Sequence, residues 1–206
     1  LVNELAMLCH KMGINIWEVI DAAKTKPYGF QAFYPGPGLG GHCIPLDPYY
    51  LSWKAREYGF HTSMIESSMM INDRMPEYTV ERAGKLLNRL KKPLNGARVL
   101  LLGVAYKQDI ADYRESPALR VMEEFRRSGA ETAYYDPFVP RCRYQGQWYA
   151  SLPELTPEAA GAFDLAVVTT AHSGVDYGAV LRAGVPVFDC KNVMKDFQDR
   201  TNIEVL

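Results

Sequence analysis

The chain has 206 residues, with 23 Lys and Arg against 24 Asp and Glu, and a formal net charge of −1. Hydrophobic residues make up 48% and charged residues 23% of it, which is ordinary for a globular protein that buries a core. The balanced charge argues against nucleic acid as a partner, and no apolar run approaches the ~20 residues that cross a membrane. The scattered cysteines favour free thiols in a reducing, cytoplasmic setting.

Helical periodicity dominates the beginning of the chain. Apolar spacing predicts a helix over 1–12 that ends at Gly13, and a second helix over 16–23 that is capped by Asn15. The first residues look like the middle of a helix, with neither a Met nor a cap. We therefore expect the chain to be a fragment whose upstream part is missing.

The periodicity stops at residues 25–48, which are rich in aromatic residues, Gly and Pro. A loop of this length in a compact domain is usually functional or disordered, and its aromatic residues argue against disorder. Asp47 and Pro48 predict the N-cap and first position of a third helix. A longer helical pattern over 62–90 follows, with a kink expected at Pro76.

After residue 93 the pattern changes to alternating strands and helices. Strands are expected over 97–103, 131–135, 165–169 and 185–189. Helices are expected over 116–128, 152–161 and 177–183. This alternation predicts an α/β fold with a Rossmann-like parallel sheet that is covered on both faces. We place the boundary between the two parts so that residues 1–94 are all helical and residues 95–206 form the sheet domain.

The loop at 36–41 (Gly-Pro-Gly-Leu-Gly-Gly) matches the letters of the dinucleotide-binding pattern G-x-G-x-x-G. That pattern has meaning only where a strand precedes it and a helix opens within it. Here an aromatic loop precedes it and Pro45 follows soon after, so we reject an NAD site at this loop. Nucleotide binding at the end of the strand expected over 97–103 stays open.

Cys43 is the candidate nucleophile, because a thiol next to a helix start can be held as a reactive thiolate. The simpler alternative is a buried structural cysteine, and this interpretation is favoured for Cys9, Cys142 and Cys190. Asp47 has two compatible roles, as a helix cap and as a carboxylate that orients or deprotonates a water. No histidine–cysteine spacing suits a metal, so no metal site is expected.

Three segments carry a family resemblance. Residues 40–48 (Gly-Gly-His-Cys-Ile-Pro-Leu-Asp-Pro) resemble the catalytic-cysteine signature of the UDP-glucose/GDP-mannose dehydrogenase family. Residues 3–6 resemble its central dimerisation domain, and residues 103–109 and 112–117 resemble the start of its C-terminal nucleotide-sugar-binding domain. The His before the Cys, with Tyr-Pro-Gly-Pro-Gly upstream, is similar to the branch that acts on UDP-N-acetylhexosamines.

The resemblance implies an NAD-dependent oxidation of the C6 alcohol of a UDP-N-acetylhexosamine to a carboxylate, with UDP-N-acetylglucosamine favoured. Cys43 would hold the sugar as a thiohemiacetal and then as a thioester, which water helped by Asp47 would hydrolyse. A thiolate suits both steps, since it is a good nucleophile and a good leaving group. The resemblance also implies a homodimer through the central helices. NAD would be bound mainly by an upstream domain, so these residues alone would be inactive.

Further site residues are implied by the same resemblance. The substrate-binding set is Phe33, Tyr34, Gly36, Gly38, Gly40, Lys107 and Lys191. Arg114 is implied to reach the cofactor. Lys107 and Arg114 have a simpler alternative as solvated surface charges, and Phe33 and Tyr34 have one as core residues. Lys191 stands where the family usually has an arginine, so it keeps the charge but loses the bidentate geometry.

Other functions stay open at this point. The enzyme could act on UDP-glucose or GDP-mannose instead. The isolated chain could be a UDP-sugar-binding and dimerisation module without activity. A cysteine hydrolase would need Cys43 paired in space with His10, His61 or His172 as its base, and nothing in the sequence requires such a pair.

Overall fold

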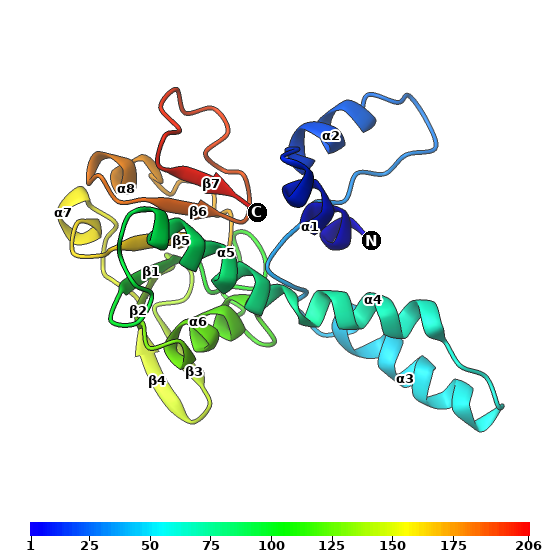
Figure 1. The fold of residues 1–206 in the computed structure, drawn as a ribbon. Helices are drawn as coiled ribbons and strands as arrows, with labels where there is room; N and C mark the ends of the chain where they lie inside the picture. The colour runs from blue at the N-terminus through cyan, green and yellow to red at the C-terminus, as the bar shows by residue number, and fades with distance from the viewer.

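Two short helices begin the chain in the computed structural model, which describes residues 1–206 (Figure 1). α1 (Val2–Met12) ends at Gly13, whose φ of 70° is left-handed. α2 (Ile16–Ala23) begins where the Asn15 side chain accepts the N–H of Trp17 at 3.0 Å. Both predicted helices are confirmed, together with the residues that end the first and cap the second.

α3 (Cys43–Glu57) and α4 (Ser63–Asp73) form a helical hairpin that projects away from the sheet (Figure 1). The helix expected over 62–90 is two helices, because α5 (Met75–Arg89) follows α4 after a break at Arg74. Pro76 explains the break, since it lacks an N–H and its ring excludes the carbonyl four residues earlier. None of the helices combines the length and the apolar character needed to span a membrane.

The second half of the chain forms a five-stranded parallel sheet in the order β2-β1-β5-β6-β7. Its strands are β1 (Arg98–Leu102), β2 (Glu131–Tyr135), β5 (Leu165–Val168), β6 (Val187–Asp189) and β7 (Ile203–Val205). The expected α/β class and parallel sheet are confirmed. β7 was not predicted from the sequence. Neither was a separate antiparallel hairpin, which is formed by β3 (Arg141–Tyr144) and β4 (Gln147–Ala150).

Helices cover both faces of this sheet. On β1, Val99 and Leu101 face one core with α5 and α6 (Pro117–Arg127), whereas Leu100 and Leu102 face the other. The second core lies under α7 (Pro157–Ala160) and α8 (Gly178–Arg182). Strands buried on both faces explain the continuous apolar runs seen in the sequence.

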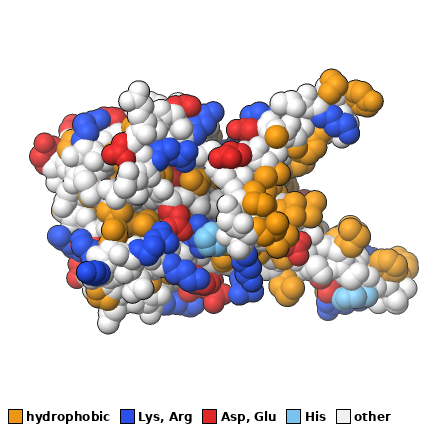
Figure 2. All heavy atoms as spheres, turned by 45° about the horizontal axis from the view of Figure 1, so that its top comes forward, with side chains coloured by type: hydrophobic (Ala, Val, Ile, Leu, Met, Phe, Trp, Pro, Cys, Tyr) orange, Lys and Arg blue, Asp and Glu red, His pale blue; other side chains and the backbone are white.

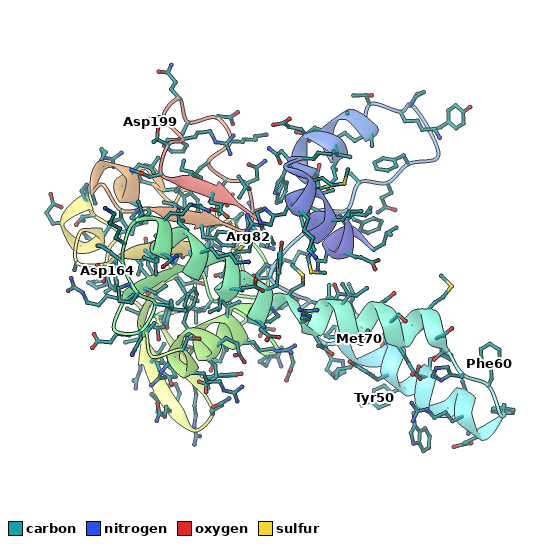
Figure 3. The ribbon with its side chains drawn as sticks, viewed as in Figure 1. Tyr50, Phe60, Met70, Arg82, Asp164 and Asp199 are labelled. Carbon is teal, nitrogen blue, oxygen red and sulfur yellow. The ribbon has the colours of Figure 1, made fainter.

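α5 packs on the sheet although it precedes the expected boundary at residue 94. Its apolar face lies in the same core as β1 and α6. Arg82, on α5, is buried and pairs with Glu204 of β7, with Nη2 2.6 Å from Oε1 (Figure 3). The division of the chain near residue 94 stays a prediction.

Candidate functional site

The cysteine loop begins as a buried segment tied to the helical part of the chain. Pro35, Gly36 and Pro37 are all buried. The N–H of Gly36 donates to Oδ1 of Asn3 at 3.0 Å, and Nδ2 of Asn3 donates to Oδ1 of Asn72 at 2.9 Å. One buried amide therefore joins the loop to both α1 and α4, which fixes the path of the chain ahead of the cysteine.

The glycines that follow lie directly against the sheet domain. A Cβ on Gly40 would stand 2.7 Å from Cβ of Tyr106 and 2.9 Å from Cδ of Pro117. A Cβ on Gly38 would stand 3.0 Å from Pro117, and one on Gly41 would stand 3.0 Å from the Tyr106 ring. No strand precedes this loop. The strand that a dinucleotide fingerprint requires is therefore missing before this loop, and the glycines permit close packing between two parts of the chain.

Cys43 is exposed and is the first residue of α3. The expectation that Asp47 caps this helix is wrong, because His42 occupies the N-cap position and Asp47 lies inside the helix. Pro45 falls in the first turn, where its missing N–H costs nothing, so the helix can start before it. The thiol therefore sits at the positive end of a helix, with the Asp47 carboxylate one turn away on the same face.

The other cysteines differ from Cys43 in their surroundings. Cys142 and Cys190 are buried in the core of the sheet domain, and burial raises the pKa of both thiols. Cys9 is half-buried on α1. The structural interpretation of Cys142 and Cys190 is confirmed by this burial, and Cys43 is left as the exposed thiol.

Tyr34 and Lys191, which are far apart in the sequence, line the same cavity of about 340 Å³. The Tyr34 ring stacks on Trp17 with 5.5 Å between centroids, and Tyr34 and Phe33 are both exposed rather than core residues. The ammonium of Lys191 lies 3.1 Å from the position of a Cβ on Gly36. Burial lowers the pKa of Lys191 and outweighs the opposing effects of Cys190 and the Asp189 carboxylate. The Asp189 carboxylate accepts the backbone N–H of Lys191 at 2.9 Å rather than its ammonium.

Lys107 and Arg114 lie on exposed segments that follow β1. The Arg114 guanidinium makes two hydrogen bonds to Asp112, at 3.0 and 2.8 Å. Tyr106 precedes Lys107, and its ring contacts the cysteine loop. Tyr106 was not among the predicted site residues. An aromatic residue just after a strand is common, so the sequence held no signal for this contact.

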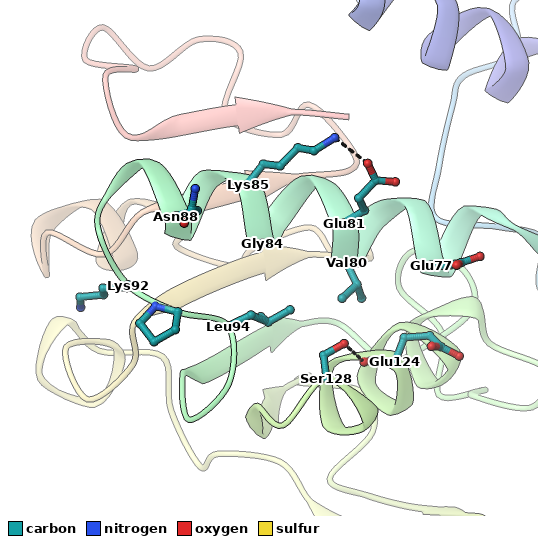
Figure 4. Close-up of a pocket in the computed structure, with 11 residues that line it drawn as sticks. Glu77, Val80, Glu81, Gly84, Lys85, Asn88, Lys92, Leu94, Glu124 and Ser128 are labelled. Carbon is teal, nitrogen blue, oxygen red and sulfur yellow. Dashed lines mark hydrogen bonds and ion pairs between the residues drawn. The ribbon is translucent and has the colours of Figure 1, made fainter.

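Another cavity lies between α5, α6 and residues 92–94 (Figure 4). Its volume is about 510 Å³, and its walls carry Glu77, Glu81, Lys85 and Glu124, with Lys85 paired to Glu81. None of the predicted site residues lines it. The predicted site residues therefore lie away from this cavity.

None of the three histidines considered as bases for a hydrolase is hydrogen-bonded to Cys43. His61 lies 3.5 Å from Glu66 on the α3–α4 hairpin, and His172 is enclosed beside Asp136. His10 is exposed on α1 near Arg82. No hydrogen bond joins any of them to the thiol, so the arrangement gives the hydrolase hypothesis no support.

Two family models match the chain. The central domain of the UDP-glucose/GDP-mannose dehydrogenase family matches residues 1–74, and the UDP binding domain of the same family matches residues 100–196. The UDP-N-acetyl-D-glucosamine 6-dehydrogenase of Pseudomonas aeruginosa is 36% identical over 173 residues, which are 84% of this chain and 40% of that protein. The UDP-N-acetyl-D-mannosamine dehydrogenase of Pyrococcus horikoshii is 39% identical over 139 residues, 68% of this chain and 32% of that protein.

Solved structures agree with these matches. A UDP-D-ManNAc dehydrogenase from Pyrococcus horikoshii superposes with a TM-score of 0.82 at 29% identity, over 99% of this chain and 47% of that chain. An NDP-N-acetyl-D-galactosaminuronic acid dehydrogenase from Methanosarcina mazei Go1 gives 0.81 at 26% identity, over 100% of this chain and 46% of that chain. The chain thus spans less than half the length of these relatives. It belongs to the UDP-glucose/GDP-mannose dehydrogenase family.

Proposed function

We propose that this chain is the cysteine-bearing and UDP-sugar-binding part of an NAD-dependent dehydrogenase that oxidises the C6 alcohol of a UDP-N-acetylhexosamine. The observation that carries the proposal is the exposed thiol of Cys43 at the start of a 15-residue helix, one turn before Asp47. The named relatives support the N-acetylhexosamine class. UDP-N-acetylglucosamine is our favoured substrate, and UDP-glucose or GDP-mannose is the second choice.

In the proposed reaction two molecules of NAD⁺ would supply the oxidising power, each accepting one hydride, the first from the C6 alcohol and the second from the thiohemiacetal. The Cys43 thiolate adds to the C6 aldehyde, and the carbonyl oxygen takes up a proton to give a thiohemiacetal. Loss of that proton and of the second hydride leaves a thioester on Cys43. Asp47 then accepts a proton from the attacking water, the C–S bond breaks, and the thiolate leaves. The dipole of α3 stabilises the thiolate as both nucleophile and leaving group.

The UDP part of the substrate is proposed to bind at the cavity of Tyr34 and Lys191. A half-buried ammonium with a lowered pKa and no carboxylate partner is stabilised by an incoming anion, and a diphosphate supplies one. The proposed set is completed by Phe33, Lys107 and the backbone of Gly36, Gly38 and Gly40. Tyr106 and Pro117 occupy the side-chain positions of Gly38 and Gly40, so these two glycines offer a ligand only their peptide groups.

Arg114 is the residue of this chain proposed to reach the cofactor. Its side chain is 84% exposed and its planar guanidinium suits a phosphate or carboxylate. The described residues include no strand, glycine-rich turn and helix in sequence that would hold a dinucleotide. We therefore place most of the NAD site outside these residues and propose that the chain alone does not reduce NAD⁺.

A homodimer through the central helices is also proposed. The α3–α4 hairpin exposes large apolar side chains, including Tyr50, Trp53, Phe60, Met64 and Met70 (Figures 2 and 3). Large apolar side chains exposed together on one projection are typical of an interaction surface, and a two-fold dimer would bury the same residues from both copies. Sedimentation should give the mass of a dimer that Trp53→Glu dissociates. A monomeric wild type would contradict the proposed dimer. A cytoplasmic location and a division near residue 94 are proposed separately.

The decisive experiment uses the enzyme that contains this chain. It is incubated with NAD⁺ and, in turn, UDP-N-acetylglucosamine, UDP-N-acetylgalactosamine, UDP-glucose and GDP-mannose. Mass spectrometry should find a sugar thioester on Cys43 that accumulates in Asp47→Asn and is absent in Cys43→Ser. Turnover with full activity in Cys43→Ser would refute the covalent mechanism.

The alternative of a binding module needs a separate test on the chain itself. Calorimetry with UDP should show binding to the wild-type chain and weaker binding to Lys191→Ala, whereas NAD⁺ should not bind strongly. UDP binding by the chain together with a complete absence of oxidation by the enzyme would favour the module over the dehydrogenase. NAD⁺ reduction by the 206 residues alone would contradict our placement of the cofactor site.

A further inference from the structure

A buried histidine and a buried aspartate lie behind the segment that carries Tyr106 and Lys107. Asp136 follows β2 and His172 follows β5, so both stand at the carboxyl edge of the parallel sheet. Their side chains are 0% and 1% exposed. Neither belongs to the proposed substrate or cofactor set, and His172 gave no support to a hydrolase, so this pair needs another explanation.

Asp136 holds the beginning of the segment. Its Oδ2 accepts the backbone N–H of Val104 at 2.8 Å and that of Ala105 at 2.9 Å. Burial alone would raise its pKa, but hydrogen bonds from His172 and these N–H groups outweigh burial and hold the pKa below its ordinary value. Oγ1 of Thr170 adds a bond to the carbonyl of Ala105 at 2.6 Å. The chain leaving β1 is thus fixed by one ionised carboxylate and one hydroxyl.

His172 holds the end of the segment. Its Nδ1 accepts the backbone N–H of Asp109 at 3.0 Å, and its Nε2 lies 3.1 Å from Oδ2 of Asp136. One neutral tautomer satisfies both contacts, with the proton on Nε2. Asp109 has a φ of 58°, which a side-chain-bearing residue adopts only when its surroundings require it. The N–H of Ser173 donates to Oδ1 of Asp109 at 2.7 Å and supports this conformation.

Tyr106 and Lys107 lie between these two fixed ends of the segment. Tyr106 lies against Gly40 through its Cβ and against Gly41 through its ring, immediately before the cysteine helix. Lys107 is exposed on the same segment. Both ends of this six-residue segment are held by one connected pair of side chains, and the N–H of Tyr106 between them donates to the carbonyl of Asp112 at 2.9 Å.

We propose that His172 and Asp136 are positioning residues, which hold segment 104–109 so that Tyr106 supports the cysteine loop and Lys107 faces the UDP-sugar. The essential contact is the hydrogen bond from the Asp109 N–H to His172 Nδ1. The part that concerns the ligand rests on the function proposed above. The part that concerns the shape of the segment does not.

Two substitutions separate the two contacts of the imidazole. In His172→Asn the amide oxygen stands near the former Nδ1 and can accept the Asp109 N–H, but the donor to Asp136 is lost. In His172→Gln the amide nitrogen stands near the former Nε2 and can donate to Asp136, but the acceptor for Asp109 is lost. Both remove the imidazole ring that packs 4.9 Å from Phe138, so a loss of packing alone affects them alike. His61→Gln, on the exposed hairpin, is the matched control.

The first measurement is amide hydrogen exchange over residues 104–109 in the full chain. His172→Gln should exchange roughly tenfold faster there than wild type, and His172→Asn and His61→Gln should stay close to wild type. Equal exchange in the two His172 variants, or unchanged exchange in His172→Gln, would overturn the proposal. If His172→Gln does not fold, Asp109→Gly is added to the His172→Gln chain and the comparison is repeated. Glycine relieves the left-handed strain at position 109, so the double variant should fold but should still exchange fast over residues 104–109.

The second measurement is UDP affinity by calorimetry. His172→Gln should raise Kd roughly tenfold, about the effect of one lost polar contact, while His172→Asn recovers most of the affinity. Unchanged UDP affinity in a His172→Gln chain with a loosened segment would refute the positioning of Lys107. A wild-type chain that does not bind UDP would instead refute the proposed function, and the exchange result would still decide whether the pair shapes the segment.

Discussion

Gly40→Ala tests whether the cysteine loop depends on close contact with the sheet domain. Gly40 is not among the residues with a positive φ, so alanine is compatible with its backbone conformation. The new methyl group would stand 2.7 Å from Cβ of Tyr106, 2.9 Å from Cδ of Pro117 and 3.2 Å from the carbonyl oxygen of Glu115. None of these atoms is the far end of a flexible side chain. The substitution therefore isolates a steric effect.

The size of the effect follows from these distances. Carbon atoms in contact prefer about 3.5–4.0 Å, so the methyl group is about 1 Å too close to two rigid neighbours. Forcing extra volume into a well-packed site costs about 1–3 kcal/mol, and we expect about 2 kcal/mol of lost unfolding free energy. For a chain of this size each kcal/mol lowers Tm by roughly 2–4 °C. Urea denaturation and thermal melting measure both quantities.

Gly84→Ala is the matched control with the opposite expected sign. Gly84 lies inside α5, and its added methyl group would meet only Cδ2 of Leu94 at 3.5 Å, an ordinary contact. Alanine should stabilise the helix by about 0.5–1 kcal/mol. A Gly40→Ala chain as stable as wild type, alongside a stabilised Gly84→Ala chain, would refute the argument that the loop is packed without room for a side chain.

Two further predictions concern buried polar contacts. Asn3→Ala leaves the Gly36 N–H and the Asn72 amide without their partner and should cost about 3 kcal/mol in urea denaturation. Burial raises the pKa of Glu204, but hydrogen bonds from Arg82 and Arg89 outweigh it and hold the pKa below its ordinary value. The unfolded state then binds the proton more readily, so this stability is present above about pH 5 and is lost as pH falls. Glu204→Gln should show a shallower acid decline; an unchanged slope would exclude this source.

Local sequence signals predicted much of the fold. Gly13 and Asn15 end and cap their helices as expected, and Ser116 caps α6 through the N–H of Ala118. These positions are encoded by the conformational and hydrogen-bonding properties of single residues, which do not depend on distant partners. The apolar runs also predicted the strands of the sheet, because strands buried on both faces carry few polar residues.

The elements that were missed had weak or conflicting local signals. The β3–β4 hairpin turns at Gln145 and Gly146, with φ values of 47° and 82°. Only the glycine indicates such a turn in the sequence, because positive φ values are typical of glycine and not of glutamine. β7 has three residues and gains its stability from pairing with β6. The start of α3 was placed five residues too late, because Asp47 and Pro48 form a plausible cap and first position. In the structure the helix begins at Cys43, since Pro45 is tolerated in its first turn.

In the candidate site, too, the sequence could not identify contacts with residues that are distant along the chain. The glycines before Cys43 indicated that the backbone is closely approached there, but a glycine pattern does not identify the approaching group. In the structure that group includes Tyr106 and Pro117, which lie far downstream in the sequence. Close approach was therefore predictable, whereas its partner depends on tertiary packing. The same packing brings the loop before Cys43 against Tyr106 of segment 104–109, so the position of this loop depends on both parts of the chain together.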